Sequence, residues 1–258
     1  MEKLTENIMK KNFFNFYKKF IKKNLINYDV IYVTSDLRGF LLKYYPITAN
    51  KLCEVIINCL LKENKTLIIP AYSFTSHGNF LVDKTPTNLS YLSKWCFKKK
   101  FKRSDHPIFS VFILGKLSKK FTRNGKSAYG KKSFWQKMLK EKSSLFHVGR
   151  PFNLGNTIIH FVEKKMKAKY RYNKVFNTKV FDGKKYLGTN YSAYVQKKNY
   201  KMKIETDTIK ISKKIEKKFF YNKIGNDKNF TNLTHIDYYK AYNFMCNEFL
   251  KNNRIFIK

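Results

Sequence analysis

The stretch Val30-Ile31-Tyr32-Val33 is a short β-branched and aromatic run that ends in the polar turn Thr34-Ser35-Asp36-Leu37-Arg38-Gly39. Such a run predicts a β-strand that leads into a loop. Residues 48–63 then carry apolar side chains at helical spacing, at Ala49, Leu52, Val55, Ile56, Cys59 and Leu60. A second strand-like run, Thr66-Leu67-Ile68-Ile69, follows. This order predicts a sheet with helical crossovers and ligand loops at the carboxyl ends of its strands.

Upstream of the first strand, residues 5–24 form an amphipathic pattern. Apolar side chains recur near helical spacing, with lysines between them, at Ile8, Phe13, Phe16, Tyr17 and Phe20. The pattern predicts a helix. We interpret it as a surface helix packed on the domain, because long lysine stems commonly flank a buried apolar stripe. Contact of the same face with lipid is the alternative.

Downstream of the second strand, the pattern is interrupted before it resumes. Residues 76–106 are irregular and polar, a length that indicates a functional loop or excursion. Ile108 to Leu114 is expected to be a strand, and Ser144 to Val148 another, before the turn from Gly149 to Gly155. A helix is expected after that turn.

The last third of the chain predicts a hairpin, a strand and a helix. Two short runs, residues 179–181 and 186–188, flank the hairpin signal Asp182-Gly183. Lys201 to Ile211 alternates as a strand does. Thr234, with Asp237 three residues later, is predicted to open a final helix with apolar positions at Tyr238, Ala241, Tyr242, Met245 and Phe249.

The whole chain fits one domain. Its 258 residues are 43% hydrophobic, which is enough for a sizeable core, and no repeat or clear linker divides them. We therefore predict a single domain over residues 1–258, of the α/β class, in which a mixed β-sheet is flanked by helices.

The charge of the chain is strongly unbalanced. Lys and Arg number 54 against 17 Asp and Glu, which gives a net charge of +37. Such an excess favours an anionic partner, such as a phosphorylated substrate, nucleic acid or an anionic membrane surface. Lys, Asn, Ile, Phe and Tyr are abundant throughout the sequence, as AT-rich coding would also produce, so the charge supports an anionic ligand without proving one.

The cysteines and the hydropathy pattern argue against a metal-binding, a disulfide-linked and a membrane-spanning protein. The four cysteines lie far apart, without a Cys-x-x-Cys pair or a metal-spaced histidine, so neither a metal site nor a disulfide framework is indicated. No apolar run approaches the ~20 residues that a membrane span needs. The start Met1-Glu2-Lys3-Leu4 lacks the apolar core of a signal peptide. We expect a cytoplasmic protein and predict no particular oligomeric state.

The segment from Gly155 to Glu163 carries the candidate chemistry. It begins with capping residues and continues as a predicted helix, so His160 and Glu163 share one helix face at i, i+3. A carboxylate there can orient the imidazole by accepting a hydrogen bond from one ring nitrogen. The other nitrogen is then left as a general base for an attacking amine. Taken alone, this spacing is also typical of an ordinary surface or core pair.

Several motifs in order resemble the aminoglycoside 3-N-acetyltransferase family. That family holds its catalytic His and Glu in an Asn-Thr-x-x-His-x-x-Glu segment, and this chain has that pattern from Asn156 to Glu163. Further similar segments cover roughly residues 28–185; they are Ser35-Asp36-Leu37-Arg38, Ile69-Pro70-Ala71-Tyr72-Ser73-Phe74, Arg103-Ser104-Asp105-His106-Pro107, Ser110-Val111 with Gly115, Tyr129-Gly130 with Ser133-Phe134-Trp135, and Tyr170-Arg171-Tyr172 with Lys174.

The resemblance implies a fold, a cofactor and site residues. The fold would be an α/β/α arrangement, and acetyl-CoA would be the acyl donor, with no metal. Its binding loops would be at Ser35, Leu37, Arg38, Ser73 and Ser110. Arg38 suits a phosphate, and loop amides suit the diphosphate or the pantetheine.

On the acceptor side, the resemblance implies roles for two more residues. His106 and Tyr72 would contact the substrate, although each is also compatible with a purely structural role. Phe109 stands where the family often has a second histidine, so a substrate contact made by that histidine is lost. Residues 190–258 match the family poorly. His77, His147 and His235 lack an orienting neighbour and are expected to be structural or exposed.

These observations predict direct acetyl transfer from acetyl-CoA to an amine, with His160 as base and Glu163 orienting it; no acyl-enzyme is required. A basic nucleic-acid-binding protein is the alternative from another class, but no recognised binding module is present. Aminoglycosides are polycations, which a chain of this charge repels on average. We therefore predict that the acceptor is a nucleotide-linked amino-deoxysugar, a precursor of surface polysaccharide, with antibiotic modification as the alternative.

Overall fold

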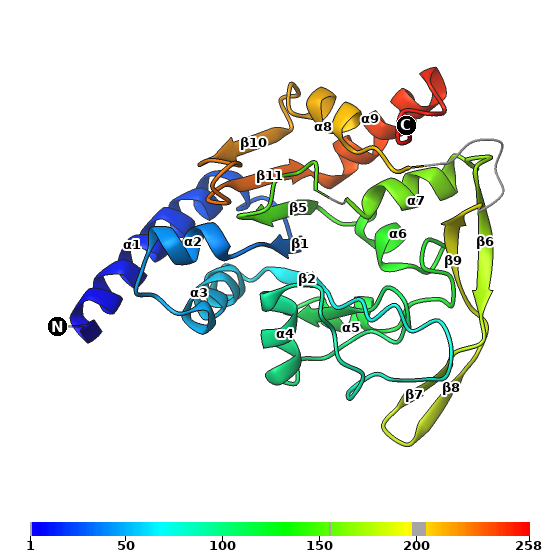
Figure 1. The fold of residues 1–258 in the computed structure, drawn as a ribbon, viewed down its shortest axis with the longest axis horizontal. Helices are drawn as coiled ribbons and strands as arrows, with labels where there is room; N and C mark the ends of the chain where they lie inside the picture. Colours follow the sequence, from blue (N-terminus) through cyan, green and yellow to red (C-terminus); the bar gives the residue numbers. More distant parts are fainter. Residues whose placement is uncertain (1, 155, 198–204) are drawn as a thin grey trace.

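A six-stranded mixed sheet runs through the middle of the protein in the computed structural model, which describes residues 2–154, 156–197 and 205–258 (Figure 1). The strand order is β10-β11-β5-β1-β2-β4. The strands are β1 (Val30–Ser35), β2 (Thr66–Pro70), β4 (Val111–Leu114), β5 (Ser143–Val148), β10 (Tyr221–Ile224) and β11 (Leu233–Asp237). Strand β1 pairs in parallel with β2 and β5, whereas β4, β10 and β11 join by antiparallel pairing.

Helices cover both faces of this sheet. They are α1 (Glu2–Asn24), α2 (Arg38–Lys43), α3 (Ala49–Lys62), α4 (Tyr91–Lys98), α5 (Ser118–Thr122), α6 (Phe134–Met138), α7 (Ile158–Lys165), α8 (Ile209–Ile215) and α9 (Tyr238–Lys251). Figure 1 shows α1 to α3 on the left of the strands and α6 and α7 on the right. The predicted α/β class and mixed sheet are confirmed.

The central strand explains why there are two helical layers. Side chains of β1 alternate between two apolar clusters, with Ile31 and Val33 in one and Val30 and Tyr32 in the other. Helices α1 to α4 complete the first cluster, and α5 to α9 complete the second. Since a fully buried aliphatic or aromatic side chain contributes about 1.5–3 kcal/mol, a strand buried on both faces anchors both layers.

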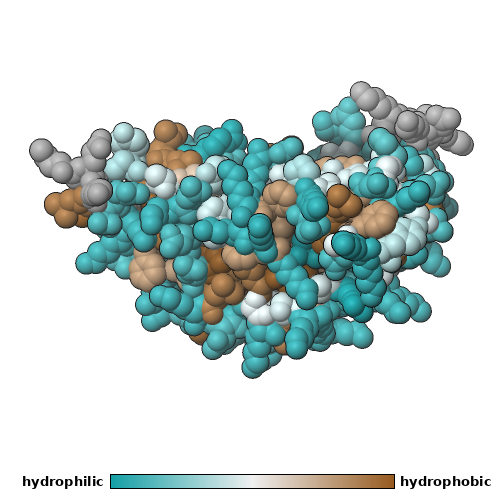
Figure 2. Space-filling model, turned by 90° about the horizontal axis from the view of Figure 1, so that it is seen from below, coloured by the Kyte–Doolittle hydropathy of each residue, from teal (hydrophilic) through white to brown (hydrophobic). Residues whose placement is uncertain are grey.

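Helix α1 packs on the sheet, as predicted. Its Phe13, Tyr17, Phe20 and Ile21 are buried, and the Phe20 ring stacks on Phe146 of β5 with centroids 5.7 Å apart. This part of the apolar face is therefore covered by protein, whereas Ile8 nearer the start of the helix is exposed. No helix in the described ranges is long and apolar enough to span a membrane. Seen from below, the surface is mostly hydrophilic, with apolar side chains in small areas (Figure 2).

Two small sheets lie at the right edge of Figure 1. One pairs β6 (Arg171–Phe176) with β9 (Tyr191–Gln196), and the other has the order β3-β7-β8, with β3 (Asn79–Leu81), β7 (Lys179–Asp182) and β8 (Lys185–Gly188). The hairpin predicted at Asp182-Gly183 joins β7 to β8 and is confirmed. Gly183 has φ +59°, a left-handed conformation that glycine adopts without strain.

Residues 76–106 are more regular than predicted. They contain β3 and α4, and Ser90 caps α4 by accepting a hydrogen bond from the Ser93 amide. Helix α4 is too short for its buried Leu92, Trp95 and Cys96 to register as a long helical pattern. Downstream, the strand that was expected to begin at Ile108 begins at Val111.

Three further element boundaries differ from those predicted from the sequence. Of the strand predicted over residues 201–211, residues 201–204 lie outside the described part, and Ile209 begins α8 instead. The last helix starts at Tyr238, capped by Asp237, while Thr234 lies inside β11. The turn after β1 is short, because α2 already begins at Arg38.

Candidate active site

His160 and Glu163 lie side by side on α7. Ile158, Ile159, Phe161 and Val162 bury the inner face of this helix, which fixes the direction of the two functional side chains. His160 Nδ1 is 2.9 Å from Glu163 Oε2. The side chain of His160 is 26% exposed and that of Glu163 is fully buried. The predicted contact at i, i+3 is confirmed.

The start of α7 differs from the predicted capping arrangement. Thr157 is the N-cap residue, but its side chain makes no capping hydrogen bond. The Asn156 amide instead donates to the Phe152 carbonyl, which holds the preceding loop. Gly155 lies outside the described residues. The helix start is thus positioned by packing and by the loop.

Two further side chains hold Glu163. The Tyr170 hydroxyl donates to Oε1 at 3.0 Å, and Arg171 Nε forms an ion pair with Oε2 at 2.6 Å. A buried carboxylate needs such partners, because burial of an unpaired charge is costly. Since Glu163 occupies Nδ1 of His160, the neutral ring presents Nε2 as its basic nitrogen. In the part of the chain that is described, no protein group hydrogen-bonds to Nε2.

Tyr129 lies against the exposed side of this pair. Its ring meets the His160 ring edge-on, with centroids 6.3 Å apart. Its hydroxyl is buried and has no hydrogen-bond partner among the described residues. Burial raises the pKa of the Tyr129 hydroxyl well above its usual value, so it remains a hydrogen-bond donor. A buried donor beside a candidate base is suited to a ligand atom.

Tyr72 approaches the same region from the loop after β2. Its hydroxyl hydrogen-bonds to that of Tyr32 at 2.8 Å, and its ring packs on Phe109, which in turn packs on Tyr129. Burial raises the pKa of Tyr72 to about 12, while hydrogen bonds with Thr157 and Tyr32 act in the opposite direction. The contact with Thr157 places Tyr72 at the start of α7.

His106 is buried and bonded to the backbone through both ring nitrogens. Nδ1 accepts from the amides of Ile108 and Phe109, each at 3.2 Å, and Nε2 lies 3.3 Å from the Ser192 carbonyl oxygen. Burial lowers the pKa of His106 to about 4. The ring therefore stabilises the 106–109 turn in its neutral form, and the predicted substrate contact stays a prediction.

Two predicted donor-loop serines use their side chains within the protein. Ser110 Oγ accepts from Arg103 Nε at 3.0 Å and donates to the Ala71 carbonyl at 2.8 Å. Ser73 Oγ donates to the Pro107 carbonyl at 2.8 Å. These bonds join the loop after β2 to the loop before β4. Any contact of Ser73 or Ser110 with a cofactor would therefore be made by their backbone atoms.

The loop after β1 offers different groups. Ser35 Oγ is buried without a hydrogen-bond partner among the described residues, and Leu37 is buried. Arg38 is exposed, ion-paired with Asp36 at 2.6 Å and stacked over the Phe230 ring. It lines a cavity of about 780 Å³ with Lys43 and Lys228. In Figure 1, α2 and α7 lie apart, so only an extended ligand could touch both Arg38 and His160.

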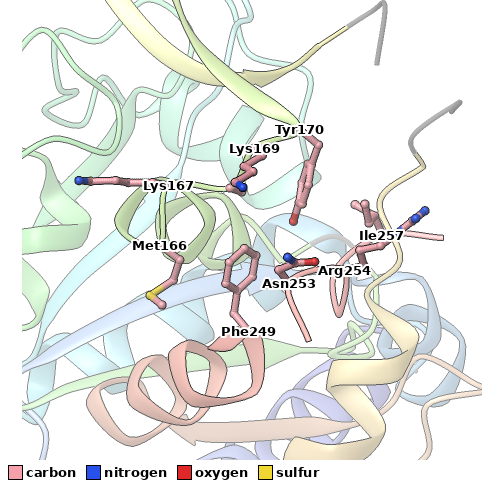
Figure 3. A pocket seen from close by; sticks show the side chains of 9 residues that line it. Met166, Lys167, Lys169, Tyr170, Phe249, Asn253, Arg254 and Ile257 are labelled. Carbon is pink, nitrogen blue, oxygen red and sulfur yellow. The ribbon is translucent and has the colours of Figure 1, made fainter. Parts of the chain in front are cut away.

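A smaller cavity lies at the C-terminal end of α7. It has a volume of about 210 Å³ and is bounded by the segment after α7 and by the C-terminal segment. Figure 3 shows Tyr170 above it, with its hydroxyl directed toward Asn253. Tyr170, which supports Glu163, thus also lines this cavity.

The comparison with known families decides the classification. The sequence model described as aminoglycoside 3-N-acetyltransferase matches residues 57–236. The chain belongs to the aminoglycoside 3-N-acetyltransferase family. Its members are N-acetyltransferases, and acetyl-CoA is the acyl donor of the family. The resemblance inferred from the sequence motifs is confirmed.

Solved structures show the same fold at low identity. The apoenzyme of aminoglycoside acetyltransferase AAC(3)-IVa is 15% identical, with 94% of this chain and 90% of that chain covered and a TM-score of 0.69. The YokD protein from Bacillus subtilis is 16% identical, with 92% and 94% covered and a TM-score of 0.67. AAC-IIIb, in a binary structure with CoASH, is 14% identical, with 91% and 95% covered and a TM-score of 0.70. No curated protein matches the chain.

Acetyl-CoA, the donor of the family, fits the chemistry of the loop after β1. The exposed Arg38 guanidinium there carries the charge and the donors that suit a phosphate of acetyl-CoA. Ser35 Oγ is buried and has no partner among the described residues.

Sequence reasoning gave no role to Tyr129, Tyr170 or Arg171. All three occur in family-like motifs, which was the available signal. Their roles depend on which side chains meet across α7, the 122–133 loop and β6, and spacing along the chain does not encode that.

Proposed function

We propose that this family member transfers the acetyl group of acetyl-CoA to the amine of a nucleotide-linked amino-deoxysugar. The observation that supports it is the His160 imidazole, which is held by Glu163 through Nδ1, while Nε2 has no hydrogen-bond partner among the described residues. This is the arrangement that general-base catalysis requires.

In the proposed mechanism, each residue has one task. Bound acetyl-CoA supplies an activated thioester. His160 Nε2 accepts the proton that the acceptor amine loses on attack and can return it to the departing sulfur. Glu163 orients the ring and stabilises its protonated form, while Tyr170 and Arg171 hold Glu163. The Tyr129 hydroxyl is placed to donate to a substrate oxygen beside His160.

The donor is proposed to bind along the loops predicted from sequence. Ser35, Leu37 and Arg38 would hold its nucleotide end, and the backbone near Ser73 and Ser110 its pantetheine. Arg38→Ala should raise the apparent KM for acetyl-CoA by several-fold and leave that for the acceptor nearly unchanged. An unaltered CoA affinity in calorimetry would show that this assignment is misplaced.

The net charge of the chain favours an anionic acceptor. Both oxygens of Glu163 are engaged by His160, Tyr170 and Arg171, so this carboxylate is not free to bind an ammonium group. The net charge of +37 attracts a diphosphate and repels a polycation. Tyr72 and His106 would line the acceptor side. Since both substrates are cytoplasmic metabolites, we place the reaction in the cytoplasm.

The test compares acceptors directly. Free-thiol release from acetyl-CoA is measured with dTDP-, UDP- and GDP-linked amino sugars and with several aminoglycosides, at two salt concentrations. We expect turnover on a nucleotide sugar and a loss of about 10²–10⁴-fold in His160→Asn. Near-normal turnover by His160→Asn would remove this base from the mechanism.

Modification of aminoglycosides is the second candidate. The observation that favours it is the likeness to AAC-VIa in its structure with sisomicin, which has 13% identity, covers 92% of this chain and 96% of that one, and has a TM-score of 0.71. Efficient turnover of an aminoglycoside, with none on a broad panel of nucleotide sugars, would establish this candidate and exclude the first.

A further inference from the structure

Another cavity lies beside the β7–β8 hairpin. Its volume is about 700 Å³, and seven of its fifteen lining residues are basic while two are acidic. Two of the cations serve the protein itself. Arg103 donates to Ser110 Oγ and to loop carbonyls, and Lys137 donates to the carbonyls of Lys120 and Arg123.

The other five cations are available to a ligand. Within the described ranges, none of them forms an ion pair with a carboxylate; they are Lys102, Arg123, Lys126, Lys132 and Lys185. Like charges that converge on a concave surface reinforce one another and attract a multivalent anion. We call the space lined by these five residues the basic cavity.

The cavity also contains an acidic and an aromatic side chain. Asp105 has one carboxyl oxygen, Oδ1, that is buried and has no hydrogen-bond partner among the described residues. Burial raises the pKa of this carboxyl. Tyr191 contributes an aromatic ring, with Lys126 Nζ 5.9 Å from its centroid. A ligand that combines phosphates with hydrogen-bonding and stacking groups would use all of these features.

One short loop connects the basic cavity to His160. Lys126 precedes Tyr129, whose ring contacts His160, by three residues, so their Cα atoms are at most about 11 Å apart. The loop is fixed to β9, because the Ala128 amide donates to the Ser192 carbonyl and the Ser192 amide to the Lys126 carbonyl. Phosphates beside Lys126 would therefore bind next to the loop that carries Tyr129 to His160.

We propose that the basic cavity binds the nucleotide diphosphate of the acceptor, so that the attached amino sugar reaches His160. This inference rests on the proposed acetyltransferase function and specifies its acceptor site. Acetyl-CoA also contains a nucleotide diphosphate, but the cavity around Arg38, Lys43 and Lys228 offers that group a separate place.

The test removes positive charges from the basic cavity and compares this variant with one that loses the same number of charges elsewhere on the surface. The variant Lys126→Gln/Lys132→Gln/Lys185→Gln removes three positive charges from the cavity. The control Lys11→Gln/Lys19→Gln/Lys22→Gln removes three exposed charges from α1. Calorimetry with UDP, dTDP and CoA, and the KM for the acceptor and for acetyl-CoA, are measured for both. Thermal melting checks the fold, and the single variant Lys126→Gln replaces the triple variant if that melts early.

The proposal expects UDP or dTDP affinity to fall by at least tenfold in the cavity variant and by less than twofold in the control, with CoA affinity retained. A loss of CoA affinity instead, or equal losses in both variants, would overturn the proposed site. Salt-sensitive binding of single-stranded RNA to the cavity, with no nucleotide binding, would also overturn it.

The measurements distinguish a failure of the cavity assignment from a failure of the proposed function. If UDP and dTDP do not bind while His160 remains essential for acetylating an aminoglycoside, the basic cavity and the nucleotide acceptor are both wrong and the acetyltransferase chemistry stands. If a nucleotide sugar is acetylated with an unchanged KM in the cavity variant, the proposed function stands and the cavity assignment is overturned.

Discussion

Glu163 has no exposed surface, and three side chains reach its two carboxyl oxygens. The same carboxylate therefore orients His160 and balances the buried guanidinium of Arg171. Removing one partner of a buried ion pair costs about 3–5 kcal/mol, so changes at Glu163 alter stability as well as chemistry. A substitution at Tyr170, which supports Glu163, separates the loss of catalysis from the loss of stability better than a substitution at Glu163 itself.

Tyr170→Phe tests the support of Glu163. The variant keeps the ring and deletes the hydroxyl that donates to Oε1. Without this bond the carboxylate is less well fixed, and we expect kcat to fall by about tenfold with little change in either KM. Tyr172→Phe, on the half-exposed neighbour in β6, is the matched control and should retain full activity. Equal kcat values for the two variants would remove Tyr170 from a positioning role.

Tyr129→Phe tests a different hydroxyl. Because the Tyr129 hydroxyl is buried without a described partner, its removal should not destabilise the fold and should raise stability by about 1 kcal/mol. If the hydroxyl donates to substrate, kcat/KM should fall by tenfold or more at the same time. A lower melting temperature would show that it has a structural partner, and unchanged kcat/KM would exclude contact with substrate.

At the scale of elements, the sequence predicts best where one face or both faces of an element are buried continuously. Helix α3 and its flanking strands β1 and β2 were predicted within two residues, because their apolar spacing follows directly from burial on the sheet. Helix α4 was missed because only eight residues carry its pattern. The His160–Glu163 pair was predictable because both residues lie on one helix, whereas its partners come from other elements.

The start of α9 gives a direct test of one corrected boundary. Asp237 accepts a hydrogen bond from the Lys240 amide at 2.9 Å and caps the helix. Asp237→Ala should lower the free energy of unfolding by about 1–2 kcal/mol, while Asp237→Asn, which can still cap, should cost much less. Thermal or denaturant melting measures both. Equal costs for the two variants would indicate that the cap contributes little.

At the scale of the whole molecule, the two apolar clusters share one sheet. We propose on this basis that residues 1–258 behave as one domain and unfold in a single transition. Three buried histidines report on that transition; His106 lies in the loop before β4, and His147 and His235 lie on the paired strands β5 and β11. Burial lowers the pKa of His106 to about 4, of His147 to about 3 and of His235 to about 4.

These three histidines should make the protein sensitive to acid below about pH 6.5. In the unfolded chain their imidazoles take up protons near pH 6.5, whereas in the native state they stay neutral until about pH 4. Between these values the unfolded state binds more protons, so stability is complete above pH 6.5 and is lost as the pH falls. Each histidine contributes about 1.4 kcal/mol per pH unit, and three together about 4. Melting temperature measured from pH 7.5 to 4.5 should decrease steeply, and His235→Gln should flatten the decrease by about a third. The exposed His77→Gln is the matched control, and an identical effect of both variants would contradict the argument.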